Sequence, residues 1–185
     1  ENYGIKILSI GFFVKPEQAL MWRGSMANNA FNQLMTDSDW GELDFLVIDM
    51  PPGTGDIQLT LAQSYSIKGA VLVTTPQKVA TADVRRAAMM YRQEKLTIPL
   101  LGIIENMSYF TPDDVPDKKY YIFGQGASDQ LANELNIQIL GRIPIEAKIS
   151  ETGDKGMPIS LMNGTPVTKA FAEIAQKLKV EVAEL

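Results

Sequence analysis

Residues 45–62 read FLVIDMPPGTGDIQLTLA, and this stretch decides which fold is expected. Its first part, Phe45 to Ile48, is a continuous apolar run, which predicts a strand buried on both faces of a parallel sheet. Asp49 follows at once, so a carboxylate is expected at the carboxyl end of that strand. Open α/β sheets bind their ligands at this end, and Asp49 is therefore a candidate site residue.

A loop and a helix are expected directly after Asp49. The loop, residues 51–55, combines two prolines, which stiffen the backbone, with two glycines, which leave it free. Asp56 is a good N-cap for a helix over 56–66, whose apolar residues keep helical spacing. Strand, terminal Asp, glycine-containing loop and helix together describe the Walker B and switch II region of a P-loop nucleotide hydrolase. There the Asp organises the Mg²⁺ shell and the loop amides sense the terminal phosphate.

Apolar runs on both sides of this stretch predict the rest of the sheet. Strands are expected at 5–11, 69–75, 99–106 and 138–144, with segments of helical spacing between them. Because strand and helix alternate along the chain, the predicted class is α/β, with a parallel sheet flanked by helices.

Composition narrows the function. The 185 residues are 45% hydrophobic, enough for a core of normal size, and the net charge of −5 argues against a nucleic-acid-binding surface. No run approaches the roughly 20 apolar residues of a membrane helix, so no membrane partner is expected. Cysteine is absent, which gives no sign of an oxidising compartment, and a cytoplasmic location is predicted.

Three motifs point to one family. The run IDMPPGTGD at 48–56 closely resembles the signature of the Mrp/ApbC family, and ENMSYF at 105–110 and WRG at 22–24 extend the match. Members of this family are MinD-like P-loop ATPases that act as iron–sulfur cluster carriers. The resemblance covers essentially all 185 residues. It implies a P-loop NTPase fold, ATP and Mg²⁺ as cofactors, an iron–sulfur cluster, a homodimer, and iron–sulfur client proteins as partners.

The resemblance also implies roles for residues near the phosphates. Asp49 would be catalytic and would hold Mg²⁺ through water, and the amide of Gly53 would face the γ-phosphate. Pro52 of the same loop is expected to contribute to nucleotide binding. Arg23 would lie near the nucleotide and the dimer contact, whereas Trp22 is interpreted as a large side chain covering the sheet.

At the other end of the nucleotide, Asn106 would read the adenine edge, because its amide is a donor and an acceptor together. From the residue alone, a strand-terminal Asn is usually a turn residue that bonds its own backbone. The Ile143-Pro144 turn would lie against the adenine by the same resemblance. Without the resemblance, Pro144 is only a strand terminator.

The chain departs from the family pattern twice. No motif of the form G-x-x-x-x-G-K-S/T occurs, and no Cys-x-x-Cys pair follows ENMSYF. We therefore expect residues 1–185 to be the C-terminal portion of a single P-loop ATPase domain, incomplete at its N-terminus. The intact protein would be an ATPase, and this chain alone would not be competent. The alternatives are a MinD/ParA-type positioning ATPase and a scaffold that kept the fold without catalysis.

The absence of soft ligands yields a first prediction. Purified anaerobically, this chain alone will hold no stoichiometric 4Fe–4S cluster, because it contains neither cysteine nor histidine. Iron content and the visible absorption spectrum measure this directly. A stable cluster spectrum from the isolated chain would contradict the prediction.

Overall fold

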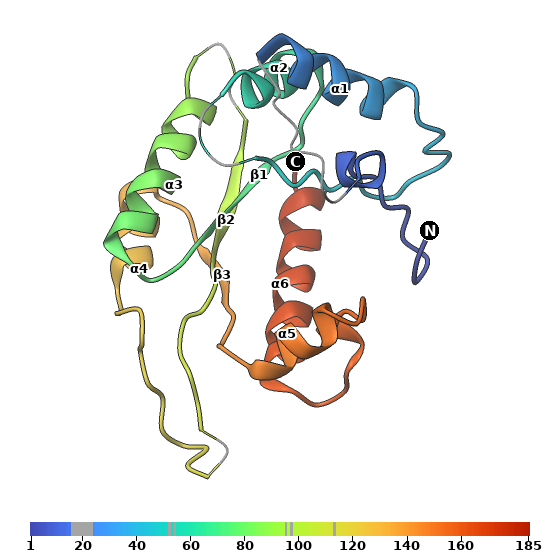
Figure 1. Cartoon of the computed structure of the whole chain (residues 1–185). Coiled ribbons are helices and arrows are strands. Elements are labelled where there is room, and N and C mark those ends of the chain that lie inside the picture. Colours follow the sequence, from blue (N-terminus) through green and yellow to red (C-terminus); the bar gives the residue numbers. More distant parts are fainter. Residues whose placement is uncertain (16–23, 52, 54, 95, 97, 113) are drawn as a thin grey trace. The chain divides into compact units, whose positions relative to one another are not determined.

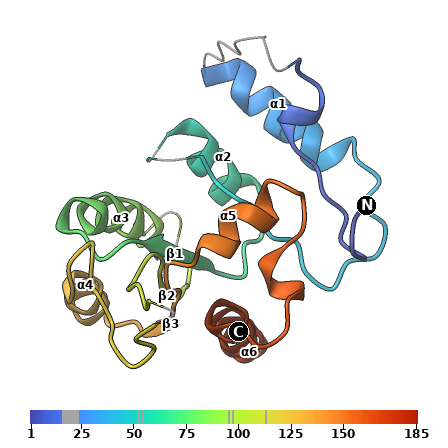
Figure 2. The same ribbon diagram turned by 60° about the horizontal axis from the view of Figure 1, so that its bottom comes forward.

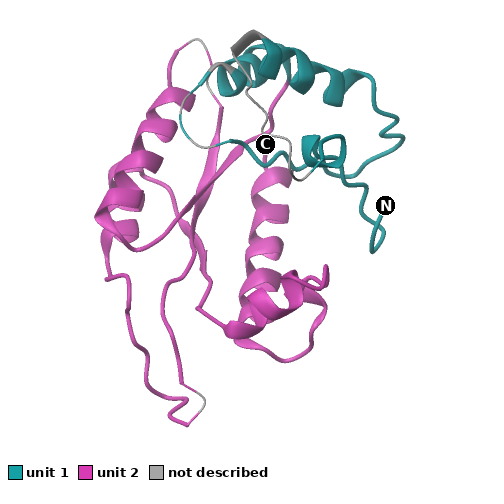
Figure 3. Cartoon of the chain, in the orientation of Figure 1, with its two compact units in different colours: residues 1–65 teal, residues 66–185 magenta. Residues whose placement is uncertain are grey.

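The computed structural model describes residues 1–15, 24–51, 53, 55–94, 96, 98–112 and 114–185 (Figure 1). Its chain contacts divide it into two compact units, unit 1 at residues 1–65 and unit 2 at residues 66–185 (Figure 3).

Unit 2 is built on a parallel sheet. Its strands are β1 (Ala70–Thr74), β2 (Leu100–Glu105) and β3 (Ile139–Arg142), in the order β1-β2-β3. Leu72 pairs with Ile103 across the first ladder, and Ile104 pairs with Gly141 across the second. The strands predicted at 69–75, 99–106 and 138–144 are thus confirmed, each slightly shorter than expected, and with them the α/β class.

Helices cover both faces of this sheet (Figure 2). α3 (Lys78–Tyr91) and α4 (Ala127–Leu135) lie on one face, where Leu72, Ile103 and Leu131 form a core. α6 (Pro166–Ala183) lies on the other face, where a second core forms around Leu140 and Val167. The short helices α5 (Ala147–Gly153) and η2 (Ile159–Leu161) precede α6. Burial on both faces explains why these strands are almost wholly apolar.

The last helix begins with a capped first turn. The hydroxyl of Thr165 caps it by accepting a hydrogen bond from the backbone N–H of Thr168 at 3.0 Å, and Pro166 opens the first turn. Val167 and Ile174 form its buried face, whereas Phe171 is 40% exposed.

Unit 1 contains helices but no strand among its described residues. They are η1 (Ile10–Phe12), α1 (Gly24–Thr36) and α2 (Asp56–Ser64). Phe31 of α1 and Leu61 of α2 are buried, and the Phe31 ring meets Tyr65 edge-to-face with centroids 6.0 Å apart. The predicted N-cap is wrong by one residue: Gly55 is the cap, and Asp56 is the first helical residue.

The strands predicted at 5–11 and 45–48 are wrong. Residues 45–50, all of them described, form neither helix nor strand, and Val47 is 89% exposed. In the first segment Ile5 makes an isolated bridge to Asn2, and the chain then enters η1. A strand needs a neighbour to satisfy its backbone N–H and C=O groups, and these runs have no ladder within the described part of unit 1. Apolarity alone was therefore an insufficient signal.

Among the described residues, no helix is both long enough and apolar enough to cross a membrane.

The packing of α6 on β3 yields a second prediction. A Cβ added at Gly141 would lie 2.4 Å from Cγ1 of the buried Ile174, so Gly141→Ala forces the helix away from the strand. We expect the free energy of unfolding to fall by about 1–3 kcal/mol, as for other overpacked cores. Urea-induced unfolding followed by circular dichroism measures the change.

Gly153 in α5 provides the matched control, because a Cβ there meets nothing within 4 Å. Gly153→Ala should leave the stability unchanged or raise it by about 0.5–1 kcal/mol, since alanine restricts the unfolded chain. Equal destabilisation by both substitutions would contradict the close packing of β3 against α6.

Candidate nucleotide-binding site

The carboxyl ends of β1, β2 and β3 meet in a small cluster in unit 2. The backbone N–H of Asn106 donates to the carbonyl of Thr74 at 2.7 Å, which ties the end of β2 to β1. On the other side, Ile143 N–H donates to the Glu105 carbonyl and Ser108 N–H donates to the Ile143 carbonyl, each at 2.9 Å. The structure thus brings together two elements that the sequence singled out, Asn106 and the Ile143-Pro144 turn.

Asn106 opens a tight turn. Its side-chain Oδ1 accepts a hydrogen bond from the backbone N–H of Met107 at 2.9 Å, and Met107 lies in the left-handed region with φ +53. This is the local turn bond that a strand-terminal Asn was expected to make. The amide keeps further capacity, because Oδ1 has a second lone pair and Nδ2 has two N–H groups. Asn106 is half-buried, so a ligand can reach it.

Ile143 and Pro144 are both buried. The Ile143 side chain belongs to the core beneath α6, together with Leu140 and Val167. A ligand at this edge would therefore meet the backbone of the turn rather than an exposed isoleucine side chain.

A buried polar network lies beneath the Asn106 turn, and the sequence analysis missed it. Glu105, 4% exposed, accepts a hydrogen bond from the hydroxyl of Ser108, which is 1% exposed. Nε of Arg142, at the end of β3, lies 3.3 Å from the same Glu105 oxygen, and the Arg142 guanidinium also bonds Asp129 of α4. Partial burial lowers the pKa of Arg142, but the carboxylates of Asp129 and Glu105 outweigh it, so the pKa lies above its ordinary value. The sequence offered one sign of this network, because Glu105 places a carboxylate near the end of an apolar strand.

The residues predicted to face the phosphates lie in unit 1. Asp49 and Gly53 are exposed, and Gly53 has φ +95, a conformation that favours glycine. Gln58 of α2, 2% exposed, donates from Nε2 to the carbonyls of Pro51 at 2.7 Å and Gly53 at 3.1 Å. It therefore holds the loop that follows Asp49, a role that the sequence did not reveal. Pro52, Trp22 and Arg23 lie outside the described residues.

The chemistry of Asp49 suits a metal held through water. In the part of the chain that the structure describes, no group of three His, Cys, Asp or Glu side chains gathers to hold a metal ion directly. A single exposed carboxylate matches Mg²⁺, which keeps several of its waters and commonly takes one or two carboxylates besides the phosphates.

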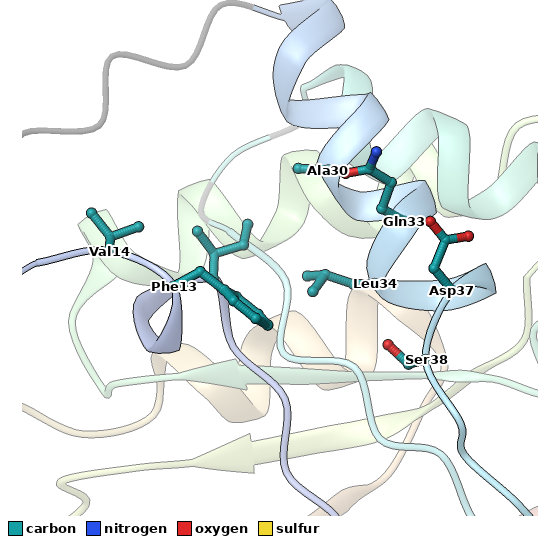
Figure 4. Close-up of a pocket in the computed structure, with 8 residues that line it drawn as sticks. Phe13, Val14, Ala30, Gln33, Leu34, Asp37 and Ser38 are labelled. Atoms are coloured by element: carbon teal, nitrogen blue, oxygen red, sulfur yellow. The ribbon is translucent and has the colours of Figure 1, made fainter.

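Unit 1 also contains a cavity of about 410 Å³ between η1 and α1 (Figure 4). Asp49 and Gly53 are not among the described residues that line it. Its lining is mainly apolar with a polar rim and consists of Ile10, Phe13, Val14, Ala30, Gln33, Leu34, Asp37 and Ser38.

These observations define a class of protein: a parallel α/β protein with an amide at the carboxyl edge of its sheet. The sequence model described as ParA: NUBPL iron-transfer P-loop NTPase matches residues 1–179. The chain therefore belongs to the NUBPL iron-transfer family of P-loop NTPases.

Similar proteins carry names of the same kind. The chain is 46% identical over 187 residues to a Synechocystis protein named iron-sulfur cluster carrier protein, covering 100% of this chain and 52% of that one. It is 50% identical over 181 residues to an Aquifex aeolicus protein of the same name, covering 96% and 49%. A Dictyostelium discoideum protein named iron-sulfur cluster transfer protein NUBPL is 42% identical over 179 residues, covering 96% and 54%. The chain thus spans about half the length of these relatives.

Solved structures agree with the fold. A nucleotide-binding protein from Archaeoglobus fulgidus, in complex with ADP, superposes with a TM-score of 0.62 at 37% identity, over 71% of this chain and 53% of that one. The cell division ATPase MinD of Pyrococcus furiosus superposes with a TM-score of 0.56 at 19% identity, over 83% and 56%. The second likeness supports the MinD-like fold alone.

The buried network yields a third prediction. Arg142→Gln leaves the buried Glu105 carboxylate without its cation, and we expect the free energy of unfolding to fall by about 1–3 kcal/mol. Chemical denaturation measures it. Arg86→Gln is the control, because Arg86 pairs with Asp83 on the exposed surface of α3 and its loss should cost less than about 0.5 kcal/mol. If both substitutions lower the free energy of unfolding equally, burial of Glu105 does not strengthen its ion pair with Arg142, and the prediction is wrong.

Proposed function

We propose that the full-length protein binds and hydrolyses ATP in the service of iron–sulfur cluster transfer. The observation that carries this proposal is the meeting of Asn106 with the Ile143-Pro144 turn at the carboxyl edge of the sheet. Ligands of open α/β sheets bind at this edge. Membership of an iron-transfer P-loop NTPase family and the likeness to an ADP-bound protein support the same function.

At the sheet edge, the protein would bind the base. The Asn106 amide offers an acceptor at Oδ1 and a donor at Nδ2, which together match the amino group and a ring nitrogen of adenine. The backbone of the Ile143-Pro144 turn would lie beside the base, and its hydrogen bonds to Glu105 and Ser108 keep it in place.

In unit 1, the loop after Asp49 would bind the phosphates. The Asp49 carboxylate would orient a water of the Mg²⁺ shell, and the backbone N–H of Gly53, next to Pro52, would approach the terminal phosphate, where Gly53 leaves room because it has no side chain. Mg²⁺, when bound, neutralises charge on the phosphates. Gln58 would hold the carbonyls of Pro51 and Gly53 in place. We propose that units 1 and 2 belong to one P-loop ATPase domain.

The cluster would be cargo rather than a resident cofactor. Relatives named as cluster carriers support this, and client proteins that receive a cluster are the expected partners. This chain contains no cysteine or histidine, so its residues supply no thiolate to such a cargo. A homodimer and a cytoplasmic location belong to the same proposal.

Substitution of Asp49 tests this function and is our fourth prediction. In the full-length protein, Asp49→Ala should lower the rate of ATP hydrolysis by roughly a hundredfold or more, the size typical of removing one electrostatic stabiliser. The melting temperature should stay unchanged, because the Asp49 side chain is exposed. A phosphate-release assay and a thermal melt measure the two effects.

Asp44→Ala is the matched control. Asp44 is an exposed carboxylate five positions earlier in the same segment and has no expected role in catalysis. Its loss should leave hydrolysis near the wild-type rate. Near-wild-type hydrolysis by Asp49→Ala would refute the metal assignment, and no hydrolysis by the wild-type protein would favour a scaffold.

A further inference from the structure

The Asn106 amide has a fixed orientation. Its hydrogen bond with Met107 involves a backbone N–H, which can only donate, so the side-chain atom that faces it must be the acceptor Oδ1. The donor Nδ2 then lies at the other end of the amide. Among the described residues, Nδ2 donates no hydrogen bond, so its N–H groups are available to a ligand.

A fixed amide discriminates between purine bases. Adenine presents an amino donor beside a ring-nitrogen acceptor, and these match Oδ1 and Nδ2 in that order. Guanine presents a carbonyl oxygen where adenine has its amino group, which would place two acceptors against each other. An amide that was free to rotate by half a turn could accept either base, so selectivity depends on what prevents the rotation.

The turn itself needs support. Met107 adopts φ +53, which is unfavourable for a residue with a side chain, and it places the Met107 N–H against Oδ1. Backbone bonds fix Asn106 to β1 and Ser108 to the turn at Ile143, on either side of Met107. Beneath them, the Ser108 hydroxyl donates to the buried Glu105 carboxylate. This hydrogen bond joins the residue before the Asn106-Met107 pair to the residue after it.

The support extends to two further elements. Arg142 holds the same Glu105 oxygen that Ser108 uses, and the other end of its guanidinium bonds Asp129 in the first turn of α4. The carboxylate is thus fixed to the end of β3 and, through Arg142, to a helix. A buried carboxylate held by a hydrogen bond and an ion pair has little freedom to move, and neither has the serine bound to it.

We propose that Glu105, Ser108 and Arg142 are positioning residues that make the site selective for adenine over guanine. They act through the turn, by keeping the Met107 N–H on Oδ1 of Asn106. The proposal rests on the proposed function, since it requires a purine at the edge of the sheet. It adds that the preference for adenine depends on buried groups that do not touch the base.

The test compares binding of ATP and GTP by the full-length protein, with dissociation constants measured by calorimetry. The wild-type protein should prefer ATP. Ser108→Ala, which removes only the hydroxyl, and Glu105→Gln, which removes the charge that holds Arg142, should each lower the GTP-to-ATP ratio of dissociation constants by about tenfold, the size of one lost hydrogen bond to a base. A merely structural role would weaken both nucleotides equally and leave the ratio unchanged.

Two further variants complete the experiment. Glu134→Gln is the matched control: it also breaks a Glu–Arg pair, that of Glu134 with Arg85 on the surface of α3 and α4, and it should leave the ratio unchanged. Asn106→Ala should abolish the preference. A thermal melt shows whether Glu105→Gln still folds. If it does not, Ser108→Ala still tests the proposal, because it removes only one hydroxyl group.

The outcomes separate the two proposals. If Asn106→Ala abolishes the preference but Ser108→Ala retains it, the adenine site stands and the positioning network is refuted. If Asn106→Ala retains the preference, or the wild-type protein binds neither nucleotide, the adenine assignment fails and the network proposal fails with it. A fall of the ratio in both Ser108→Ala and Asn106→Ala, with Glu134→Gln unchanged, confirms the proposal.

Discussion

Unit 2 depends on the pairing of β2 with a strand on each side. β1 and β3 both bond to it in parallel, and its residue Ile103 is completely buried in the core under α3 and α4. The two ladders also set the site, because the register that pairs Thr74 and Arg142 with Glu105 brings all three strand ends to one level. Asn106 follows Glu105 directly and bonds back to Thr74. The position of the candidate adenine-reading amide is therefore a consequence of sheet register.

The sequence was a good guide to this sheet and a poor one to unit 1. Strands β1, β2 and β3 were predicted correctly because their apolar runs are flanked by helices that cover both faces. The runs at 5–11 and 45–48 are also mainly apolar, yet the structure leaves Val47 almost fully exposed and forms no strand there. An apolar run indicates a tendency to be buried, whereas a strand requires a neighbour with free N–H and C=O groups. Periodicity carries no information about that neighbour.

The candidate site was predictable to a similar extent. Asn106 could be found because a polar residue at the end of an apolar strand is conspicuous and because the ENMSYF motif resembles that of a known family. The network of Glu105, Ser108 and Arg142 was not found, since Arg142 is distant in sequence from the other two and meets Glu105 through the β2–β3 pairing. The role of Gln58 was not predicted for another reason. Its sequence position is that of an ordinary helical residue, and its hydrogen bonds to the carbonyls of Pro51 and Gly53 depend on the tertiary structure.

The most direct test of this account is an experimental structure of the full-length protein with ADP bound. The account predicts that the adenine lies at the carboxyl ends of β1, β2 and β3. Oδ1 of Asn106 should be within hydrogen-bonding distance of the adenine amino group, and the Met107 N–H should still be on the same oxygen. A well-ordered ADP whose base lies elsewhere, or an Asn106 amide turned to face the base with the opposite end, would contradict it.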